Sequence, residues 1–196
     1  DNGTTDNGTL FTIAIDSSNF DCSEVGVNTV NFKAIDASGN RDSVNVLVTV
    51  IDSLKPLIVT QPITVYLGTN GLATITANDL DNGTSDNCQL ASIAIDSTTF
   101  DYTELGPNNV WFTAVDVNSN VDSMIVVVTV LDTTRPLVAT QPRTIYLDAS
   151  GQATITADGS HDRTADKGTL FTIAIDSSNF DCSEVGVNTV NFKAID

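Results

Sequence analysis

The chain repeats itself with a period of 80 residues. The segment Gly8–Asp36 recurs unchanged at Gly168–Asp196, and a looser copy lies between them at Cys88–Asp116. Such a period predicts an array of similar modules rather than one large domain. Because both outer copies are cut, we expect the parent protein to continue in both directions. The expected boundaries are 1–52 for the C-terminal part of a first repeat, 53–132 for a complete repeat and 133–196 for the N-terminal part of a third.

Short stretches of alternating apolar and polar residues fill the complete repeat. In "NVWFTAVD", Val110, Phe112 and Ala114 share one face, and Gly, Asn and Asp punctuate the chain every 8–12 residues. This pattern predicts an all-β sandwich with no helix. Six strands are clear, and a seventh is sought in 77–90 or 102–110.

Two strands have features of their own. Pro62 cannot donate a backbone hydrogen bond, which predicts an edge strand that kinks or changes sheet there. The stretch "SMIVVVTVLD" (Ser123–Asp132) is apolar on both faces. It therefore predicts a strand that is covered on both sides.

Two long segments, Val30–Pro56 and Val110–Pro136, share the pattern V-x-F-x-A-x-D followed by V-x-V-x-D-x-x-x-P. They resemble the HYR-type immunoglobulin-like module, which is related to fibronectin III domains. The stretch "DNGTSDNC" (Asp81–Cys88) and the "YL-x-x-x-G-x-ATITA" hairpin resemble tandem repeats of giant surface adhesins of gliding bacteria. The resemblance implies tandem immunoglobulin-like β-sandwiches of about 80 residues at the bacterial cell surface.

The cysteines depart from the patterns of these families. HYR modules often carry cysteines at the positions of Gln61 and Val44, and many adhesin repeats pair an "N-C" with an "F-x-C" cysteine. Here each repeat keeps one cysteine: Cys22, Cys88 or Cys182. Cysteines of different repeats are expected to lie beyond the ~7 Å Cα separation of a disulfide. We therefore predict three unpaired thiols, with Cys22 a small core residue.

The charge of the chain is strongly negative, at −17. Such a charge repels nucleic acid and suits either cation binding or simple solubility. No apolar run reaches the ~20 residues of a membrane helix. His161 is the single histidine and is expected in a solvated loop. No triad or histidine-based metal site is available, so we predict no enzyme.

Acidic residues gather in the loops rather than on the strands. Linkers and loops of adjacent modules are expected to meet at one end of the sandwich, where hard oxygen ligands suit Ca²⁺. The competing interpretation is that these residues only form turns. The third repeat has Gly159 and His161 at two of the positions. The expected calcium ligands at this junction are Asp52, Asp79, Asp81, Asp86, Asp116 and Asn120.

Two kinds of surface feature remain. Trp111 is expected on the outer face, where it either stacks on a sugar ring or is covered by a neighbouring segment. Triplets of Asp, Ser or Thr and a third residue resemble a bacterial O-glycosylation signal, and they also arise by chance in such a composition. The candidate sites are Ser43, Ser53, Ser97, Ser123 and Thr133.

Three functions follow as hypotheses. The first is a structural spacer of a secreted adhesin or motility filament, because modules joined by short linkers give length. The second is a set of repeats that bind polysaccharide or surfaces themselves. The third is an accessory region of a secreted enzyme. The expected partners are neighbouring repeats, surface polysaccharide and secretion or motility machinery.

Overall fold

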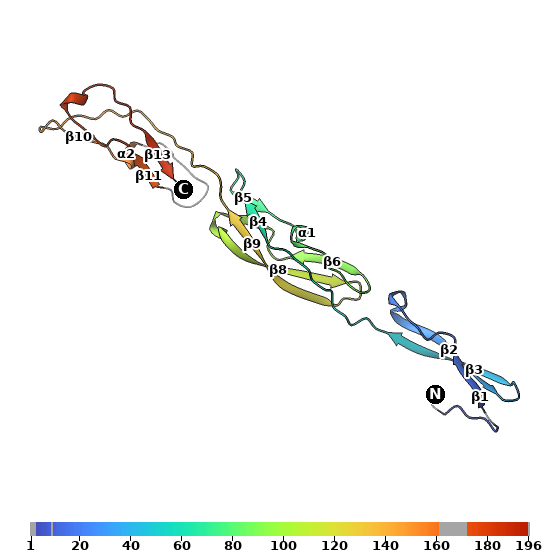
Figure 1. Cartoon of the computed structure of the whole chain (residues 1–196). Coiled ribbons are helices and arrows are strands. Elements are labelled where there is room, and N and C mark those ends of the chain that lie inside the picture. The colour runs from blue at the N-terminus through green and yellow to red at the C-terminus, as the bar shows by residue number, and fades with distance from the viewer. Residues whose placement is uncertain (1–2, 9, 161–171, 196) are drawn as a thin grey trace. The chain divides into compact units, whose positions relative to one another are not determined.

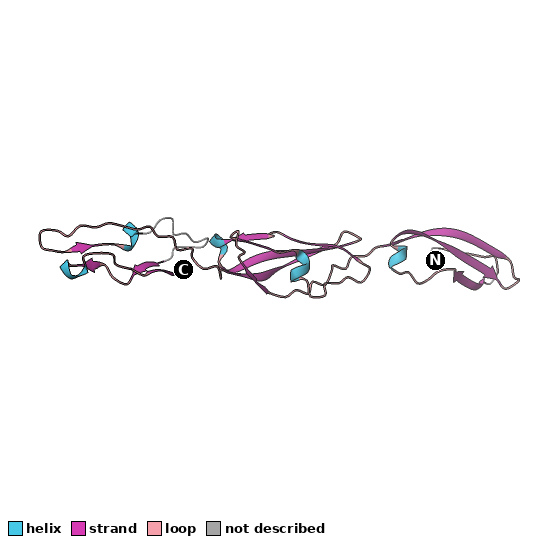
Figure 2. Ribbon diagram, turned by 90° about the horizontal axis from the view of Figure 1, so that it is seen from above, coloured by secondary structure: helices cyan, strands magenta, loops and turns pink. Residues whose placement is uncertain are grey.

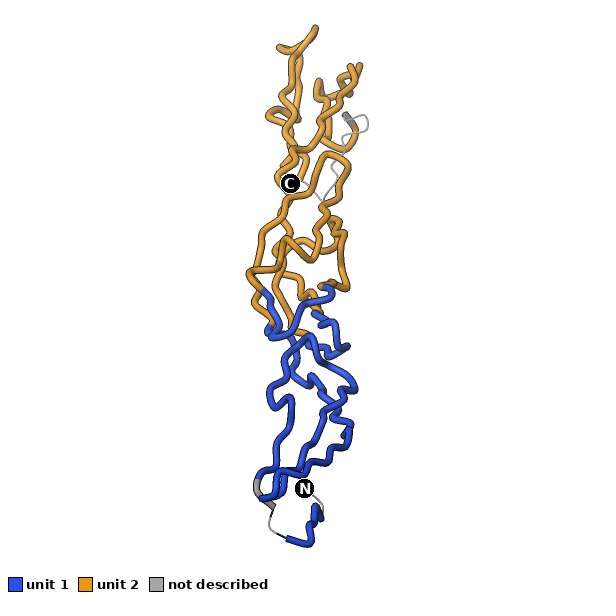
Figure 3. The backbone as a smooth tube through the Cα atoms, turned by 90° about the vertical axis from the view of Figure 1, so that its right-hand side faces the viewer, with its two compact units in different colours: residues 1–57, 84–92, 114–122 blue, residues 58–83, 93–113, 123–196 orange. Residues whose placement is uncertain are grey.

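The computed structural model describes residues 3–8, 10–160 and 172–195, and strands dominate it (Figures 1 and 2). The all-β character expected from the sequence is confirmed. No helix in these residues is long and apolar enough to cross a membrane. The described part forms two compact units (Figure 3): residues 1–57, 84–92 and 114–122 form the first, and 58–83, 93–113 and 123–196 form the second.

The first repeat contributes a three-stranded antiparallel sheet in the order β1-β2-β3. The strands are β1 (Leu10–Ile15), β2 (Gly26–Asp36) and β3 (Arg41–Val50). A 3-10 turn, η1 (Cys22–Glu24), precedes β2. Strands β2 and β3 pair without interruption from Gly26 with Val50 to Ile35 with Arg41.

One face of this first sheet is uncovered. An apolar groove of about 540 Å³ lies along it. Val46 is 45% exposed there, whereas Val126, one repeat later, is 4% exposed. The groove thus marks a sheet face that no strand among the described residues covers. Its apolar lining is Ile15, Phe20, Val30, Phe32, Val44, Val46 and Val48.

The stretch 53–132 holds a four-stranded sheet, β4-β9-β8-β6, and a two-stranded sheet, β5-β7. Strand β4 runs parallel to β9, whereas β5 and β7 are antiparallel. The elements are β4 (Ile63–Tyr66), β5 (Leu72–Thr74), α1 (Ala77–Leu80), β6 (Leu90–Ile95), β7 (Thr99–Asp101), η2 (Tyr102–Glu104), β8 (Gly106–Asp116) and β9 (Val121–Leu131).

Strand alternation places the core where the sequence predicts it. Val110, Phe112 and Ala114 on β8 are completely buried. On β9 the prediction is wrong in part, because only Val126, Val128 and Val130 are buried, and Ile125 and Val127 are exposed. Its second apolar face has no covering layer in the described part.

The segment 77–90 contains a helix instead of a seventh strand. Helix α1 begins after Thr76, whose backbone N–H and hydroxyl both donate to Asp79 Oδ2, at 2.7 and 2.8 Å. Isolated bridges join Leu57 to Ser85 and Thr60 to Asp81. The chain pairs with this segment before Pro62 and with β9 after it, and β4 is an edge strand. The edge strand predicted from Pro62 is thereby confirmed.

The third repeat has short strands in two pairs, β10 with β12 and β11 with β13. Its Phe180 is buried, as is Phe100 one repeat earlier. The elements are β10 (Ala153–Thr154), α2 (Ala157–Ser160), β11 (Thr172–Ile175), β12 (Asn179–Phe180), η3 (Cys182–Glu184) and β13 (Phe192–Ile195).

Candidate functional site

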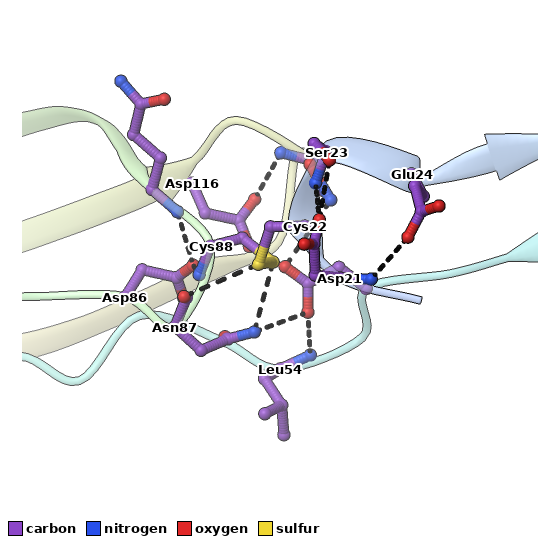
Figure 4. The surroundings of a disulfide bond; sticks show 12 residues. Asp21, Cys22, Ser23, Glu24, Leu54, Asp86, Asn87, Cys88 and Asp116 are labelled. Carbon is purple, nitrogen blue, oxygen red and sulfur yellow. Dashed lines mark hydrogen bonds between the residues drawn. A yellow bond between two sulfur atoms is a disulfide. The ribbon is translucent and has the colours of Figure 1, made fainter. Parts of the chain in front are cut away.

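A disulfide joins the first repeat to a loop of the next. Cys22 and Cys88 are bonded, with Cα atoms 5.2 Å apart and a sequence separation of 66 residues (Figure 4). The prediction of three unpaired thiols is therefore wrong, and Cys22 is an exposed bridge residue rather than a core residue. The reason is that η1 and the segment 84–92 lie in the same compact unit. Only Cys182 is a free thiol among the described residues, and it is exposed.

The turn that presents Cys22 is fixed by its own side chains. Asp21 Oδ1 accepts from the backbone N–H of Ser23 at 2.8 Å, and Glu24 Oε2 accepts from the backbone N–H of Asp21 at 2.9 Å. This capping box satisfies two donors at the start of η1. The Asn28 amide then donates to the Glu24 carbonyl at 2.6 Å. The cysteine is thus held at a defined place beside Cys88.

Three carboxylates converge in the same unit as this disulfide. Asp52 ends the first repeat, Asp86 precedes Cys88, and Asp116 ends β8. One carboxylate oxygen from each lies within 4.8 Å of the others. Figure 4 shows Asp86 and Asp116 beside the disulfide. We call Asp52, Asp86 and Asp116 the acid trio.

Asp116 is the most buried member, at 2% exposed. Its Oδ1 accepts from the backbone N–H groups of Asn118 and Asn120, at 2.8 and 2.7 Å, and its Oδ2 accepts from the Asn120 amide at 2.8 Å. Burial raises the pKa of Asp116, but the hydrogen bonds from Asn120 and from the turn backbone outweigh it, so the pKa lies below the usual aspartate value. The group is therefore ionised at neutral pH.

Asp86 and Asp52 have fewer donors. Asp86 Oδ2 accepts from the backbone N–H of Cys88 and of Gln89, at 2.9 and 3.2 Å, whereas its buried Oδ1 has no hydrogen-bond partner. Asp52 accepts from the Leu54 N–H at 3.1 Å and receives long contacts of 3.5 Å from the amides of Asn87 and Asn118.

Not all six sequence-predicted calcium ligands meet at this place. Asn120 does, because its amide also donates to the Asp52 backbone carbonyl at 3.3 Å. Asp79 and Asp81 are not part of the acid trio and lie in the second compact unit. The Asp79 carboxylate caps α1, and hydrogen bonds from the backbone and hydroxyl of Thr76 lower its pKa.

The surface candidates lie on strands and linkers. Trp111 is 49% exposed, on the face of β8 opposite Phe112. Ser97 is half-buried. His161 lies outside the described residues. The other candidate glycosylation residues are exposed: Ser43, Ser53, Ser123 and Thr133.

Sequence reasoning missed the disulfide, although a signal was present. The adhesin pattern pairs an "N-C" with an "F-x-C" cysteine. The first repeat has the second of these as Cys22, and the middle repeat has the first as Cys88. The two halves of the pair therefore stand in consecutive repeats. The two amides that approach Asp52, from Asn87 and Asn118, were also missed.

Comparisons with known proteins give no family. No protein-family model matches the chain, and a search of curated proteins finds no relative.

Proposed function

We propose that this chain is a run of tandem immunoglobulin-like spacer repeats from a long secreted adhesin or motility filament. The observation that carries the proposal is the disulfide between Cys22 and Cys88, which ties one 80-residue repeat to the next. A covalent tie across a repeat boundary restricts how two modules turn against each other. Restricted rotation favours reach and stiffness, which is what a stalk requires.

The recurrence of one local structure supports a modular array. The capping box of Asp21 and Glu24 returns as Asp101 with Glu104 and as Asp181 with Glu184. The asparagine amide that closes each turn donates to the glutamate carbonyl at 2.6–2.7 Å in all three repeats. The side-chain hydrogen bonds of this turn thus repeat with the 80-residue period of the sequence.

The disulfide also supports an extracellular location. Structural disulfides persist in oxidising compartments and are rare in the cytosol. We place the repeats at the bacterial cell surface, with neighbouring repeats, surface polysaccharide and the secretion or motility machinery as partners. An antibody raised against this chain should label intact cells. Labelling only after the cells are opened would contradict the location.

Single-molecule pulling tests the spacer role. The chain should resist extension and unfold in discrete steps under oxidising conditions. Reduction should release the chain between Cys22 and Cys88, whose sequence separation is 66 residues, and thereby add about 220–240 Å of contour length at 3.3–3.6 Å per residue. A chain that extends without resistance would rule out a load-bearing spacer.

One observation favours the second function, binding of polysaccharide by the repeats themselves. Trp111 and Tyr66 are exposed aromatic side chains, on β8 and β4 of one sheet. Aromatic rings with one exposed face are suited to contacts with apolar sugar faces. A glycan panel probed with the wild-type chain and with Trp111→Ala separates the two functions. Binding that Trp111→Ala abolishes favours recognition, and no binding by either protein favours the spacer.

A further inference from the structure

We propose that the acid trio of Asp52, Asp86 and Asp116 binds one calcium ion, which fastens the end of the first repeat to two loops of the next. Oxygens that share a calcium ion at 2.3–2.6 Å lie at most about 5 Å apart. The three carboxylate oxygens lie within 4.8 Å of one another and meet this limit. The inference goes beyond the spacer role, because calcium binding can be measured whether or not the repeats act as a spacer.

The electrostatics of the trio favour a cation. Three carboxylates whose oxygens lie within 4.8 Å of one another repel one another when charged, and a cation between them relieves that repulsion. No member of the trio forms an ion pair with Lys or Arg in the part of the chain that the structure describes. The nearby Lys55 ammonium instead pairs with Asp122, at 3.7 Å. The negative charge of the trio thus has no protein counter-ion.

Asp86 provides the independent observation. Its Oδ2 is held by two backbone N–H groups, so Oδ1 is the oxygen left for a ligand. Oδ1 is shielded from solvent and accepts no hydrogen bond. A buried carboxylate oxygen without a partner is unfavourable, and a metal ion supplies the missing interaction.

The surrounding groups complete an oxygen-rich site. Asp116 Oδ1 accepts two hydrogen bonds and Oδ2 accepts one, which orients the carboxylate and leaves Oδ2 a lone pair for a metal. The amide nitrogens of Asn87 and Asn118 approach Asp52 at 3.5 Å, and a flip of either amide would present its neutral carbonyl oxygen in the same place. Calcium takes six to eight oxygen ligands in flexible geometry, with water completing the shell.

The acids of the trio recur with the 80-residue period. The position of Asp86 is Asp6 and Asp166 in the other repeats, and that of Asp116 is Asp36 and Asp196. The position of Asp52 is Asp132. Asp79, which caps α1 instead, is replaced by Gly159. The positions of Asp86 and Asp116 are thus aspartate in all three copies and that of Asp52 in the two copies that include it, although Asp166 and Asp196 lie outside the described residues.

Isothermal titration of the whole chain with CaCl₂, at physiological salt after removal of metal ions, tests the site. We expect saturable binding that Asp86→Asn weakens at least tenfold. Asp122→Asn removes a half-exposed carboxylate that pairs with Lys55 outside the trio, and it should leave the affinity unchanged. Calcium should raise the melting temperature of the wild type, and EDTA should reverse this.

Circular dichroism and the intact Cys22–Cys88 bond will show that Asp86→Asn is folded, and Asp52→Asn provides a second test in the linker. Equal affinity in wild type and both trio variants would overturn the site, as would no binding. Displacement by equimolar Mg²⁺ would overturn its assignment to calcium. None of these outcomes affects the pulling experiment, so the two proposals fail separately.

Discussion

Cys22 is covalently bonded to Cys88 across a boundary between repeats, at a sequence separation of 66 residues. A bridge of this span removes much of the conformational entropy of the unfolded chain, about 4 kcal/mol in the chain-entropy model. We expect Cys22→Ser with Cys88→Ser to lower the free energy of unfolding by about 2–5 kcal/mol. Chemical denaturation of the double variant measures this.

Cys182→Ser is the matched control, because the Cys182 thiol is free and exposed. It should leave the free energy of unfolding unchanged. Equal stability of the wild type and the double variant would show that the bridge does not hold the first repeat in place.

The identity of the first and third copies predicts a second bridge in a longer chain. Cys182 stands where Cys22 does, and its turn has the same capping box. Fusing residues 37–132 after Asp196 continues the repeat in register and places a second copy of Cys88 66 residues after Cys182. Peptide mapping without reduction should find both bridges. A thiol at Cys182 that remains alkylatable in the fused protein would contradict this.

The sequence predicts which face of a strand is buried where that depends only on the order of residues along the strand. Period-2 alternation identifies the buried face of β8, where Val110, Phe112 and Ala114 are inaccessible. The same rule fails on the outer face of β9. Ile125 and Val127 are exposed, and apolar character alone does not reveal whether a covering layer exists.

Contacts between distant segments account for the other misses. Cys22 and Cys88 belong to different repeats. Their proximity depends on the packing of the first repeat against the segment 84–92, which the spacing of residues in the sequence does not reveal. The sequence suggests Asp79 as a calcium ligand because it lies in the same acidic stretch as Asp86. The spacing of Thr76 and Asp79 is that of a helix cap, which the structure forms at α1. The carboxylate of Asp79 therefore serves as a local helix cap and does not join the acid trio.

The two faces of β8 provide a direct test of the core. Phe112→Ala should lower the free energy of unfolding by about 3–5 kcal/mol, because it leaves a cavity in a fully buried region. Trp111→Ala, at the next residue, should change it by about 1 kcal/mol or less, because that side chain is half exposed. Urea denaturation compares the two. A larger effect at Trp111 would mean that its face is covered.

Acid should destabilise the repeats through their turn carboxylates. Hydrogen bonds from the hydroxyl and the backbone N–H of the residue two positions later lower the pKa values of Asp21, Asp101 and Asp181 in the folded chain. Their stabilising effect is complete above the unfolded pKa, near 3.9, and is lost as the pH falls through the lower folded values. The melting temperature should therefore fall below about pH 4.

Replacing all three aspartates by asparagine keeps a capping side chain but removes the titration. The triple variant should lose less stability than the wild type between pH 5 and pH 2. Melting temperatures measured by circular dichroism across that range decide the question. Parallel curves would assign the acid sensitivity to other groups.

The groove over the first sheet predicts that strands added in front of it stabilise this sheet. Residues 53–80 carry β4, β5 and α1, and placing a copy of them before Asp1 restores the 80-residue register. Val46 should then become buried, as Val126 is. Each newly buried aliphatic side chain contributes about 1.5–3 kcal/mol, so this repeat should melt at a higher temperature.

Calorimetry of the extended chain provides the measurement, and hydrogen exchange at β3 localises the change. A control extension of the same length and composition in scrambled order should leave the transition unchanged. Equal protection of β3 in the two extended chains would show that the added strands do not cover the groove, and that the first repeat does not complete a sandwich in the same way as residues 53–132.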